Sequence, residues 1–585
     1  MLIDEVISFD STKRHRFLCW GVFPLCLAGV VLVQGFMVWR SIGITYDETY
    51  YLLAGQKYFA EGKVRKFIEG GVAPLPILLS NWLPALNFRS QHLDHRLSHK
   101  QEADAIKQAR LAYMFLVGLP LMLVVYIWLL RRRGWLAALV GGLLVSFSPS
   151  LMAHVTIATT DACLSLFLIV TLAALIRYAS SPSWHSLAFV GFAFGLAISS
   201  KLSALTLLPV VVLSLIHTDF ACSPEGAWVG RGILRGLFRV WGRLSVVCLL
   251  AMFTLWLLLG FKVEPALGVG NHQTLNKMLG SGRLANVVIH GLERLPVPMA
   301  IRLARFQFNH AVVGHETYLM GKVSTTASPW YFPIAFVIKS TPSELVLALG
   351  LVVIAASRRA RRDWTLTLWL LTIFFLGIAV VINKIAIGLR YILPIYPLMI
   401  LCVVDGLFDL VRTPQRRFLC AALLVLPQAF SALSISPAYL SYFNACCGGP
   451  VVGHEYLVDS NNDWGQDLPA LAKTLNGLGA KTSVLAYFGT DHPDNYGIKY
   501  VKWDTEDAKA IAESDFVVVS VTLLHGVYVE GKDPFRDFRG LSPVGRAAYS
   551  MFVYDLRDPV VKSALDKARE RYFQKKSRVE KGPSA

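Results

Sequence analysis

Residues 17–52 read FLCWGVFPLCLAGVVLVQGFMVWRSIGITYDETYYL. The first part of this stretch, Phe17 to Arg40, is an apolar run long enough to cross a bilayer, which takes about 20 residues of α-helix. The run is too long for a signal-peptide core and lacks a convincing small-residue cleavage site, so an uncleaved first helix is predicted. Two adjacent carboxylates, Asp47 and Glu48, follow beyond its outer end among three tyrosines. This pattern predicts proton-transfer chemistry at a membrane surface.

The composition of the 585-residue chain indicates a membrane protein. Hydrophobic residues make up 54% of the chain and charged residues 16%, with a mean hydropathy of +0.50, which is too apolar for a soluble protein of this size. The net charge of +18 fits Lys and Arg residues that gather on cytoplasmic loops and set the topology. No nucleic-acid partner is therefore needed to explain the charge.

Further apolar runs bring the predicted total to about eleven transmembrane helices, each of about 20 residues. They follow the first run at residues 109–130, 134–152, 162–180, 185–200, 202–217, 243–262, 331–356, 364–382, 391–411 and 417–436. A cytoplasmic amino terminus places all the basic clusters on one side: Lys13 to Arg16, Arg131 to Arg133, the Arg231, Arg235, Arg239 and Arg243 ladder, Arg358 to Arg362, and Arg412 to Arg417. The interval 185–217 is either one bent helix or two helices around Lys201, and losing one span there would invert everything downstream.

Three segments are expected on the outer side: residues 41–108, residues 263–330 and the part from 437 onward. In the first, the apolar stretch 72–86 carries several prolines and suggests a helix lying in the interface. In the last, short β-rich runs alternate with helical patterns before a basic tail. The predicted fold is a polytopic α-helical membrane protein (residues 1–436) with a small C-terminal α/β extramembrane domain (residues 437–585).

The chain shows no cysteine or histidine spacing that is typical of a metal site. The acidic residues between Asp459 and Asp467 are spaced like a loose calcium loop, but the central glycine and terminal glutamate of an EF-hand are missing, which favours a packed turn. Asp47 and Glu48 could together hold a divalent cation, although no further ligand is identifiable. No cofactor is therefore predicted with certainty.

Five motifs in order along the chain carry a resemblance to a known family. They follow the Asp47-Glu48 pair after the first helix and are Ala158-Thr159-Thr160-Asp161-Ala162, Gly314 to Gly321, Trp330 to Pro333 running to Lys339-Ser340-Thr341-Pro342, Gly388 to Pro394, and Tyr442-Phe443-Asn444 through Asp459 to Asp467. With them the chain resembles the class C glycosyltransferase fold. Within that fold it is similar to the bacterial branch of the protein O-mannosyltransferase and aminoarabinose transferase family (glycosyltransferase family 39-like). The region after about residue 470 is matched only loosely.

The resemblance implies transfer of a hexosyl or pentosyl group, with inversion, from a polyprenyl-phosphate-linked donor to an acceptor hydroxyl. It also implies a multi-pass protein of the bacterial inner membrane whose active site and C-terminal domain are periplasmic. The acceptor can be a protein, lipid A or another glycolipid, and the sugar stays open. The expected partners are the lipid-linked donor, membrane lipid and the acceptor.

Asp47 is the candidate general base, because the acceptor hydroxyl must lose a proton as it attacks the anomeric carbon. The alternative is that Asp47 only caps the helix predicted over residues 48–60. Glu48 is either a second catalytic group or a structural partner of the site.

Arg390 is the candidate cation for the leaving phosphate, since its forked donors suit an anion that gains charge as the bond breaks. Alternatively, Arg390 snorkels or pairs with a neighbouring carboxylate. Lys201, Lys322 and Lys339 are further candidates for the donor phosphate. The candidates for holding or orienting the acceptor are Asp161, His315, Glu316 and Tyr391; Asp161 could equally cap a helix, and His315 could be a satisfied loop histidine.

Two other classes of protein fit parts of this pattern. A polytopic transporter or flippase of a lipid-linked or anionic substrate would place ionisable residues in mid-span on facing helices, whereas most of them here lie at the outer ends of spans. No convincing inverted repeat is present either. A membrane-anchored binding protein would instead have its activity in the C-terminal domain. The large outer loops favour an enzyme that works at the membrane surface.

Overall fold

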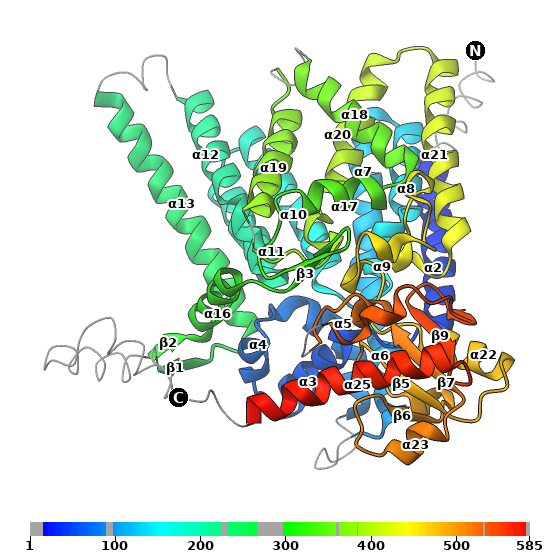
Figure 1. Cartoon of the computed structure of the whole chain (residues 1–585). Coiled ribbons are helices and arrows are strands. Elements are labelled where there is room, and N and C mark those ends of the chain that lie inside the picture. Colours follow the sequence, from blue (N-terminus) through cyan, green and yellow to red (C-terminus); the bar gives the residue numbers. More distant parts are fainter. Residues whose placement is uncertain are drawn as a thin grey trace, which may run out of the picture.

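The computed structural model describes residues 16–88, 97–223, 231–265, 296–357, 362–382, 384–529 and 533–580. A bundle of helices occupies one end of the molecule, and a smaller α/β unit covers the other end (Figure 1). The basic residues 13–15 and 358–361, which the topology argument used, lie outside the described residues.

The helices of the bundle and of its outer segments run through the described residues up to Ile435. They are α2 (Phe23–Ser41), α3 (Tyr46–Glu61), α4 (Arg65–Glu69), α5 (Pro74–Phe88), α6 (His99–Tyr113), α7 (Leu119–Arg133), α8 (Trp135–Ser146), α9 (Pro149–Val155), α10 (Thr160–Ser180), α11 (Trp184–Ser200), α12 (Leu208–Cys222), α13 (Arg231–Leu258), α16 (Met299–Val313), α17 (Tyr331–Lys339), α18 (Pro342–Ala356), α19 (Trp364–Val381), α20 (Ile395–Leu410) and α21 (Pro414–Ile435). Two short hairpins, β1 (Val263–Pro265) with β2 (Pro296–Pro298) and β3 (Thr317–Leu319) with β4 (Lys322–Ser324), flank α16.

Within the described residues, seven helices are long and apolar enough to cross a membrane, or eight if the bent pair α8–α9 is one span. The fold class of a polytopic α-helical membrane protein is therefore confirmed. All eleven predicted runs contain helix, but several are too short or too sharply broken to pass as single spans. The pair α8–α9 bends by 68°, and α17 ends just before α18 begins. The count of about eleven spans stays a prediction.

The ambiguous interval 185–217 contains two helices. α11 ends at Ser200, Lys201 is extended with φ −163° and ψ 131°, and a 3₁₀ turn over Leu202–Leu207 leads into α12. The chain therefore breaks at the lysine, which places its side chain at a helix end.

Ion pairs bring the basic end of α7 together with α19 and α20. Arg132 contacts Asp363 and Asp405 at 2.6 and 2.9 Å, and Arg133 contacts Asp405 and Asp409 at 2.8 Å each. The end of α20, near which Asp405 and Asp409 stand in the sequence, lies at the end of the bundle opposite the α/β unit (Figure 1). The gathering of these arginines at one end agrees with the predicted common side.

The C-terminal part contains a five-stranded mixed sheet with the order β6-β5-β7-β9-β8. β5 pairs in parallel with β6 and β7, whereas β9 pairs antiparallel with β7 and β8. Its elements are α22 (Leu468–Gly477), β5 (Ser483–Ala486), β6 (Tyr500–Lys502), α23 (Ala508–Ala512), β7 (Phe516–Ser520), α24 (Val521–Leu524), β8 (Gly545–Ala547), β9 (Met551–Asp555) and α25 (Pro559–Glu580).

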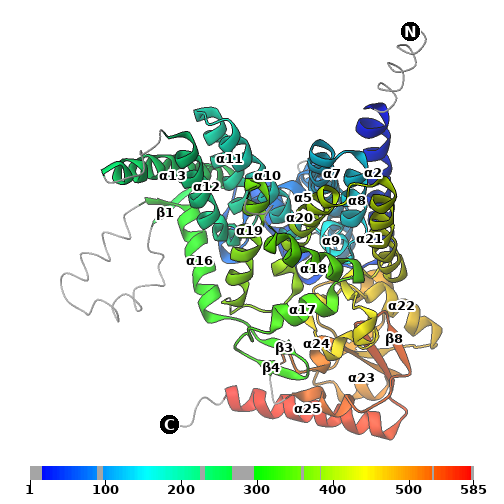
Figure 2. The same cartoon turned by 90° about the horizontal axis from the view of Figure 1, so that it is seen from above.

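The central strand β7 is buried along its whole length, and its side chains alternate between two apolar clusters. Val517 and Val519 pack on the side that includes Leu565 of α25, while Phe516 and Val518 pack on the side that includes Leu471 of α22. Two-sided burial explains the continuous apolar sequence of this strand. Figure 2 shows the β3–β4 hairpin between the bundle and this unit.

Candidate active site

Asp47 lies in the first turn of α3, where the chain leaves the first predicted span. The turn is capped by its neighbours, because the backbone N–H and the hydroxyl of Thr45 both donate to Oε2 of Glu48 at 2.9 Å. Asp47 is therefore not needed as a cap. Its carboxylate is partly exposed and accepts a hydrogen bond from the Tyr51 hydroxyl at 3.2 Å.

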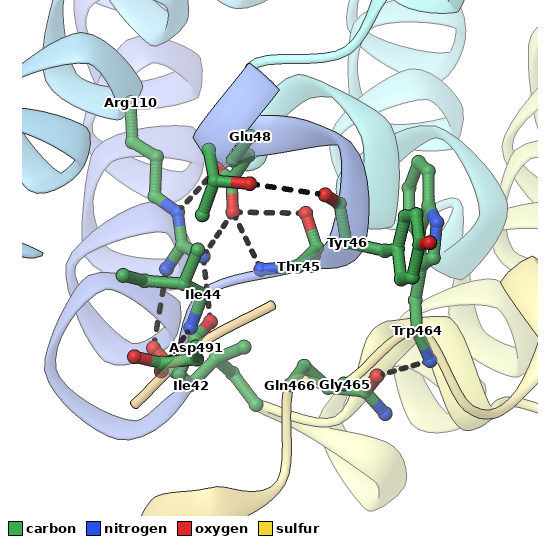
Figure 3. Close-up of polar contacts among 12 residues, drawn as sticks. Ile42, Ile44, Thr45, Tyr46, Glu48, Arg110, Trp464, Gly465, Gln466 and Asp491 are labelled. Carbon is green, nitrogen blue, oxygen red and sulfur yellow. Dashed lines mark hydrogen bonds and ion pairs between the residues drawn. The ribbon is translucent and has the colours of Figure 1, made fainter. Parts of the chain in front are cut away.

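Glu48 forms a buried ion pair with Arg110 (Figure 3). Arg110 of α6 donates from Nε and Nη2 to the two carboxylate oxygens of Glu48, at 2.7 and 2.6 Å. Arg110 also donates to the carbonyls of Ile42 and Gly43, at 3.1 and 2.7 Å. Both side chains are almost fully buried. Glu48 and Arg110 therefore join the start of α3 to α6, and a lost partner would leave a buried charge.

Arg390 meets Asp47 although the two are far apart in sequence. Nη1 of Arg390 lies 2.8 Å from Oδ2 of Asp47, and the arginine side chain is 9% exposed. Burial opposes the positive charge, but Asp47 and nearby tyrosines outweigh burial and raise the pKa of Arg390 above its ordinary value. The candidate base and the candidate phosphate ligand thus form one ion pair, and the Nε atom of Arg390 is buried without a hydrogen-bond partner among the described residues.

A second ion pair lies beside the first. Nζ of Lys201 is 2.5 Å from Oδ1 of Asp161 and 4.0 Å from the centre of the Tyr391 ring. The guanidinium of Arg390 is 5.8 Å from the same ring. Burial and the charge of Arg390 lower the pKa of Lys201, which Asp161 opposes. Four of the predicted residues therefore surround Tyr391: Asp47, Asp161, Lys201 and Arg390.

Asp161 lies in the first turn of α10, whose N-cap position is Thr159. Its Oδ2 atom is buried and has no hydrogen-bond partner among the described residues. Together with the unpaired Nε of Arg390, this leaves one donor and one acceptor unsatisfied in the cluster. Buried polar atoms are normally paired, so these atoms are suited to binding a polar ligand.

The two other predicted phosphate ligands lie elsewhere. Lys339 is 4% exposed, and its ammonium donates to the carbonyls of Leu440, at 2.8 Å, and of Asn461. These carbonyls account for the burial of its charge. Lys322 is an exposed residue of the β4 strand. The structure does not bring either lysine to the Asp47–Arg390 pair.

The predicted pair on the second outer segment faces the C-terminal unit. Nε2 of His315 lies 3.0 Å from Nε2 of His310, and its ring packs against Tyr528. Burial and the neighbouring His310 lower the pKa of His315. Glu316 accepts a hydrogen bond from the backbone N–H of Tyr528 at 2.8 Å. These contacts attach the segment to the α/β unit.

The acidic residues between Asp459 and Asp467 each have separate hydrogen-bond donors. Asp459 accepts from the Tyr528 hydroxyl at 2.7 Å, Asp463 from the Thr522 backbone N–H at 3.0 Å, and Asp467 from the Ser550 hydroxyl at 2.7 Å. Burial raises the pKa of Asp459 and of Asp467 to about 6 and that of Asp463 to about 7. This arrangement is a packed turn.

Among the described residues, no group of three or more His, Cys, Asp or Glu side chains is arranged to hold a metal ion. Asp47 and Glu48 point to different arginines, so the described geometry does not bring them together as ligands.

Three residues of the site escaped the sequence analysis. Arg110 neutralises Glu48, Trp464 lies over Arg390 with 4.4 Å between its ring centre and the guanidinium carbon, and Tyr51 donates to Asp47. Trp464 stands inside the quoted motif Asp459 to Asp467, so its place in that motif could have marked it as a site residue. Arg110 stands at the start of an apolar run, where a snorkelling side chain is equally expected.

Residues 103–233 match the family described as dolichyl-phosphate-mannose-protein mannosyltransferase. None of the curated proteins matches the chain. The matched segment runs from α6 to the beginning of α13 and contains Arg110, Asp161 and Lys201. Over this segment the match bears out the resemblance to this family.

Two solved structures are similar over most of the chain. The crystal structure of ArnT from Cupriavidus metallidurans bound to undecaprenyl phosphate has a TM-score of 0.44 and 14% identity, covering 93% of this chain and 99% of that one. The crystal structure of the Archaeoglobus fulgidus oligosaccharyltransferase in the apo form has a TM-score of 0.37 and 11% identity, covering 85% and 70%. Both likenesses are distant.

Proposed function

We propose that this chain, whose residues 103–233 match the dolichyl-phosphate-mannose-protein mannosyltransferase family, transfers a sugar from a polyprenyl-phosphate-linked donor to an acceptor hydroxyl. The observation that carries the proposal is the contact of 2.8 Å between Asp47 and Arg390. The proposal takes Asp47 as the proton acceptor and Arg390 as the phosphate-binding cation, and the contact supports it because the reaction needs both groups close together.

Asp47 serves as the general base. The acceptor hydroxyl gives its proton to the carboxylate while its oxygen attacks the anomeric carbon and the bond to the donor phosphate breaks. Because one base activates the acceptor for direct displacement, the configuration of the sugar inverts. A partly exposed carboxylate suits this role, since the acceptor must reach it.

Arg390 and Lys201 bind the phosphate of the donor. Both are basic side chains next to Tyr391, and each pairs with a carboxylate in this structure. A donor phosphate competes with Asp47 for the Arg390 guanidinium, which offers several N–H groups in a planar fork. Donor binding therefore loosens the hold of Arg390 on Asp47 and frees the base for the acceptor.

The remaining candidates have supporting roles in this proposal. Glu48 positions α3 through Arg110, and Asp161 orients Lys201. Lys339 joins backbone carbonyls of the C-terminal part to α17. His315 and Glu316 attach the second outer segment, and Lys322 takes no part in phosphate binding.

The reaction takes place at the periplasmic face of the inner membrane. Helix α3, which carries Asp47, and the α/β unit lie at the end of the bundle opposite the turn between α20 and α21 (Figure 1). Arg132 and Arg133 both pair with Asp405 in the second half of α20. The positive-inside rule assigns such arginines to the cytoplasm. The acceptor is a hydroxyl of a protein, of lipid A or of another glycolipid.

The test combines a product search with binding of a defined lipid. Mass spectrometry of envelope lipids and glycoproteins from a deletion strain should show the loss of a glycosylated species, restored by the wild-type gene and not by the Asp47→Asn gene. Purified protein should bind undecaprenyl phosphate, with lower affinity after Arg390→Lys and little change in melting temperature. Movement of a lipid-linked sugar across vesicles with no covalent product would instead identify a flippase.

A further inference from the structure

The nine residues from Asp459 to Asp467 contact Arg390 and the turn that leads into Asp47. We propose that this segment, called here the bridging segment, sets the position of Arg390 relative to Asp47, and that Trp464 is its key positioning residue. The proposal rests on the proposed function and gives the C-terminal α/β unit a part in the active site.

On one side, the bridging segment pairs with the turn that carries Asp47 (Figure 3). The backbone N–H of Gly43 donates to the carbonyl of Gln466, and the N–H of Tyr46 donates to the carbonyl of Trp464, both at 2.8 Å. A Cβ atom on Gly43 would lie 3.0 Å from the Gln466 oxygen, so the two backbones are in close contact. The residue directly before Asp47 is thus hydrogen-bonded to Trp464.

On the other side, the bridging segment binds the 3₁₀ turn Leu389–Ile392 that carries Arg390. The N–H of Leu389 donates to Oδ1 of Asn461, and the Ser460 hydroxyl donates to the carbonyl of Ile387, both at 2.9 Å. The residues on either side of Gly388 are therefore both attached to the segment. These two hydrogen bonds fix the backbone position from which the Arg390 side chain extends.

Trp464 connects the two sides. Its ring lies over the guanidinium of Arg390 at 4.4 Å, a distance typical of cation–π contacts. The side chain is 2% exposed, so the surrounding packing holds the ring in place, and the backbone N–H of Trp464 donates to Oε1 of Gln466 at 2.7 Å. The ring therefore presents a fixed face to Arg390, while its carbonyl holds the turn before Asp47.

The bridging segment is itself anchored in the C-terminal unit. Thr522 of α24 donates to Asp463, Ser550 donates to Asp467, and Asn462 donates to the Tyr549 carbonyl at 3.3 Å. The unit thus acts as a rigid support for two catalytic groups that belong to the helical part. A support of this kind explains why the unit covers this end of the bundle.

The test measures the affinity of full-length protein for undecaprenyl phosphate. Trp464→Leu removes the aromatic face and should weaken binding by about tenfold, whereas Trp464→Phe keeps a ring and should stay within about threefold of wild type. The matched control is Trp503→Leu, because Trp503 is equally part of the C-terminal unit but packs on Phe535 and Tyr572. It should leave the affinity unchanged. Wild-type affinity in folded Trp464→Leu, or equal losses in both Leu variants, overturns the proposal.

A double-mutant cycle separates positioning from a general structural effect. If Trp464 acts through Arg390, Trp464→Leu should weaken binding less than about twofold in an Arg390→Lys background. Full additivity of the two losses overturns the proposal.

A wild-type protein that fails to bind the lipid contradicts the proposed function instead. In that case, the double-mutant cycle of Trp464→Leu and Arg390→Lys is repeated with melting temperature as the readout, which tests the contact between the two side chains without a ligand. Non-additive shifts support the bridge between Trp464 and Arg390, and additive shifts overturn it.

Discussion

Two adjacent carboxylates in the first outer turn have different partners. Asp47 pairs with Arg390 and Glu48 with Arg110, because neighbouring side chains of a helix point about 100° apart. The carboxylate of Glu48 is buried with both oxygens hydrogen-bonded, whereas the carboxylate of Asp47 is partly exposed and open to an acceptor. The same dipeptide thus provides a structural ion pair and a candidate base.

Asp47→Asn should lower transfer by about 10²–10⁴-fold with normal membrane insertion, because the amide keeps the size of the side chain and cannot accept the proton. Transfer would be measured with purified protein and a lipid-linked donor. Activity within a few-fold of wild type would remove Asp47 from the reaction. Glu48→Gln is the matched comparison, and it should lower the melting temperature because Arg110 loses its buried counter-charge.

The buried carboxyl group of Asp463 should make the folded protein less stable as the pH rises. Burial raises its pKa from 3.8 to about 7, so the protonated form favours the folded state. That contribution is complete below about pH 4 and is lost as the pH rises through about 7. The side chain of Asp463→Asn stays neutral at every pH. The melting temperature of this variant minus that of wild type should therefore increase as the pH rises from 5 to 8. A constant difference over this range would contradict the raised pKa.

Among the elements, the 3₁₀ turn that carries Arg390 depends on a close approach at Gly388. A Cβ atom there would lie 2.3 Å from the Ser460 hydroxyl oxygen, so in Gly388→Ala either the turn moves from the bridging segment or the hydroxyl turns away and loses its bond to the Ile387 carbonyl. We expect a loss of about 1–3 kcal/mol in stability and weaker donor binding. Gly377→Ala in α19 is the control, since nothing lies within 4 Å of a Cβ atom there.

The Gly388→Ala defect should be partly relieved by Ser460→Ala, which removes the clashing oxygen. Melting curves and lipid-binding measurements on the two single variants and the double variant would check this. A double variant that is no better than Gly388→Ala alone would show that the close contact is not the cause.

For the whole molecule, the arrangement of charges predicts the topology. A reporter fused after Ala585 should be periplasmic, and one inserted at Thr413 should be cytoplasmic, as the arginines around α7 and α21 require. A cytoplasmic signal from the carboxyl-terminal fusion would place Asp47 and the α/β unit on the wrong face for a lipid-linked donor.

The sequence by itself determined the class of this protein and most of its elements. Runs of about 20 apolar residues specify helices locally, because every backbone polar group in a bilayer must be bonded within its own segment. The short β-rich runs around Phe516 and Met551 likewise appear as β7 and β9. Asp47, Asp161 and Arg390 were found from motifs at helix ends and Lys201 as a cation beside an apolar run, and the four lie close together in the structure.

The tertiary structure alone decided which charges meet. Arg110 and Glu48 are 62 positions apart, and Arg390 and Asp47 are 343 positions apart. Periodicity reports only local burial, so it could not separate Lys201, which joins the cluster, from Lys339, which binds carbonyls. Nor could it place Trp464 on Arg390. Partners of buried charges are selected by the packing of distant segments, because a charge leaves water only where the complete fold supplies its counter-charge.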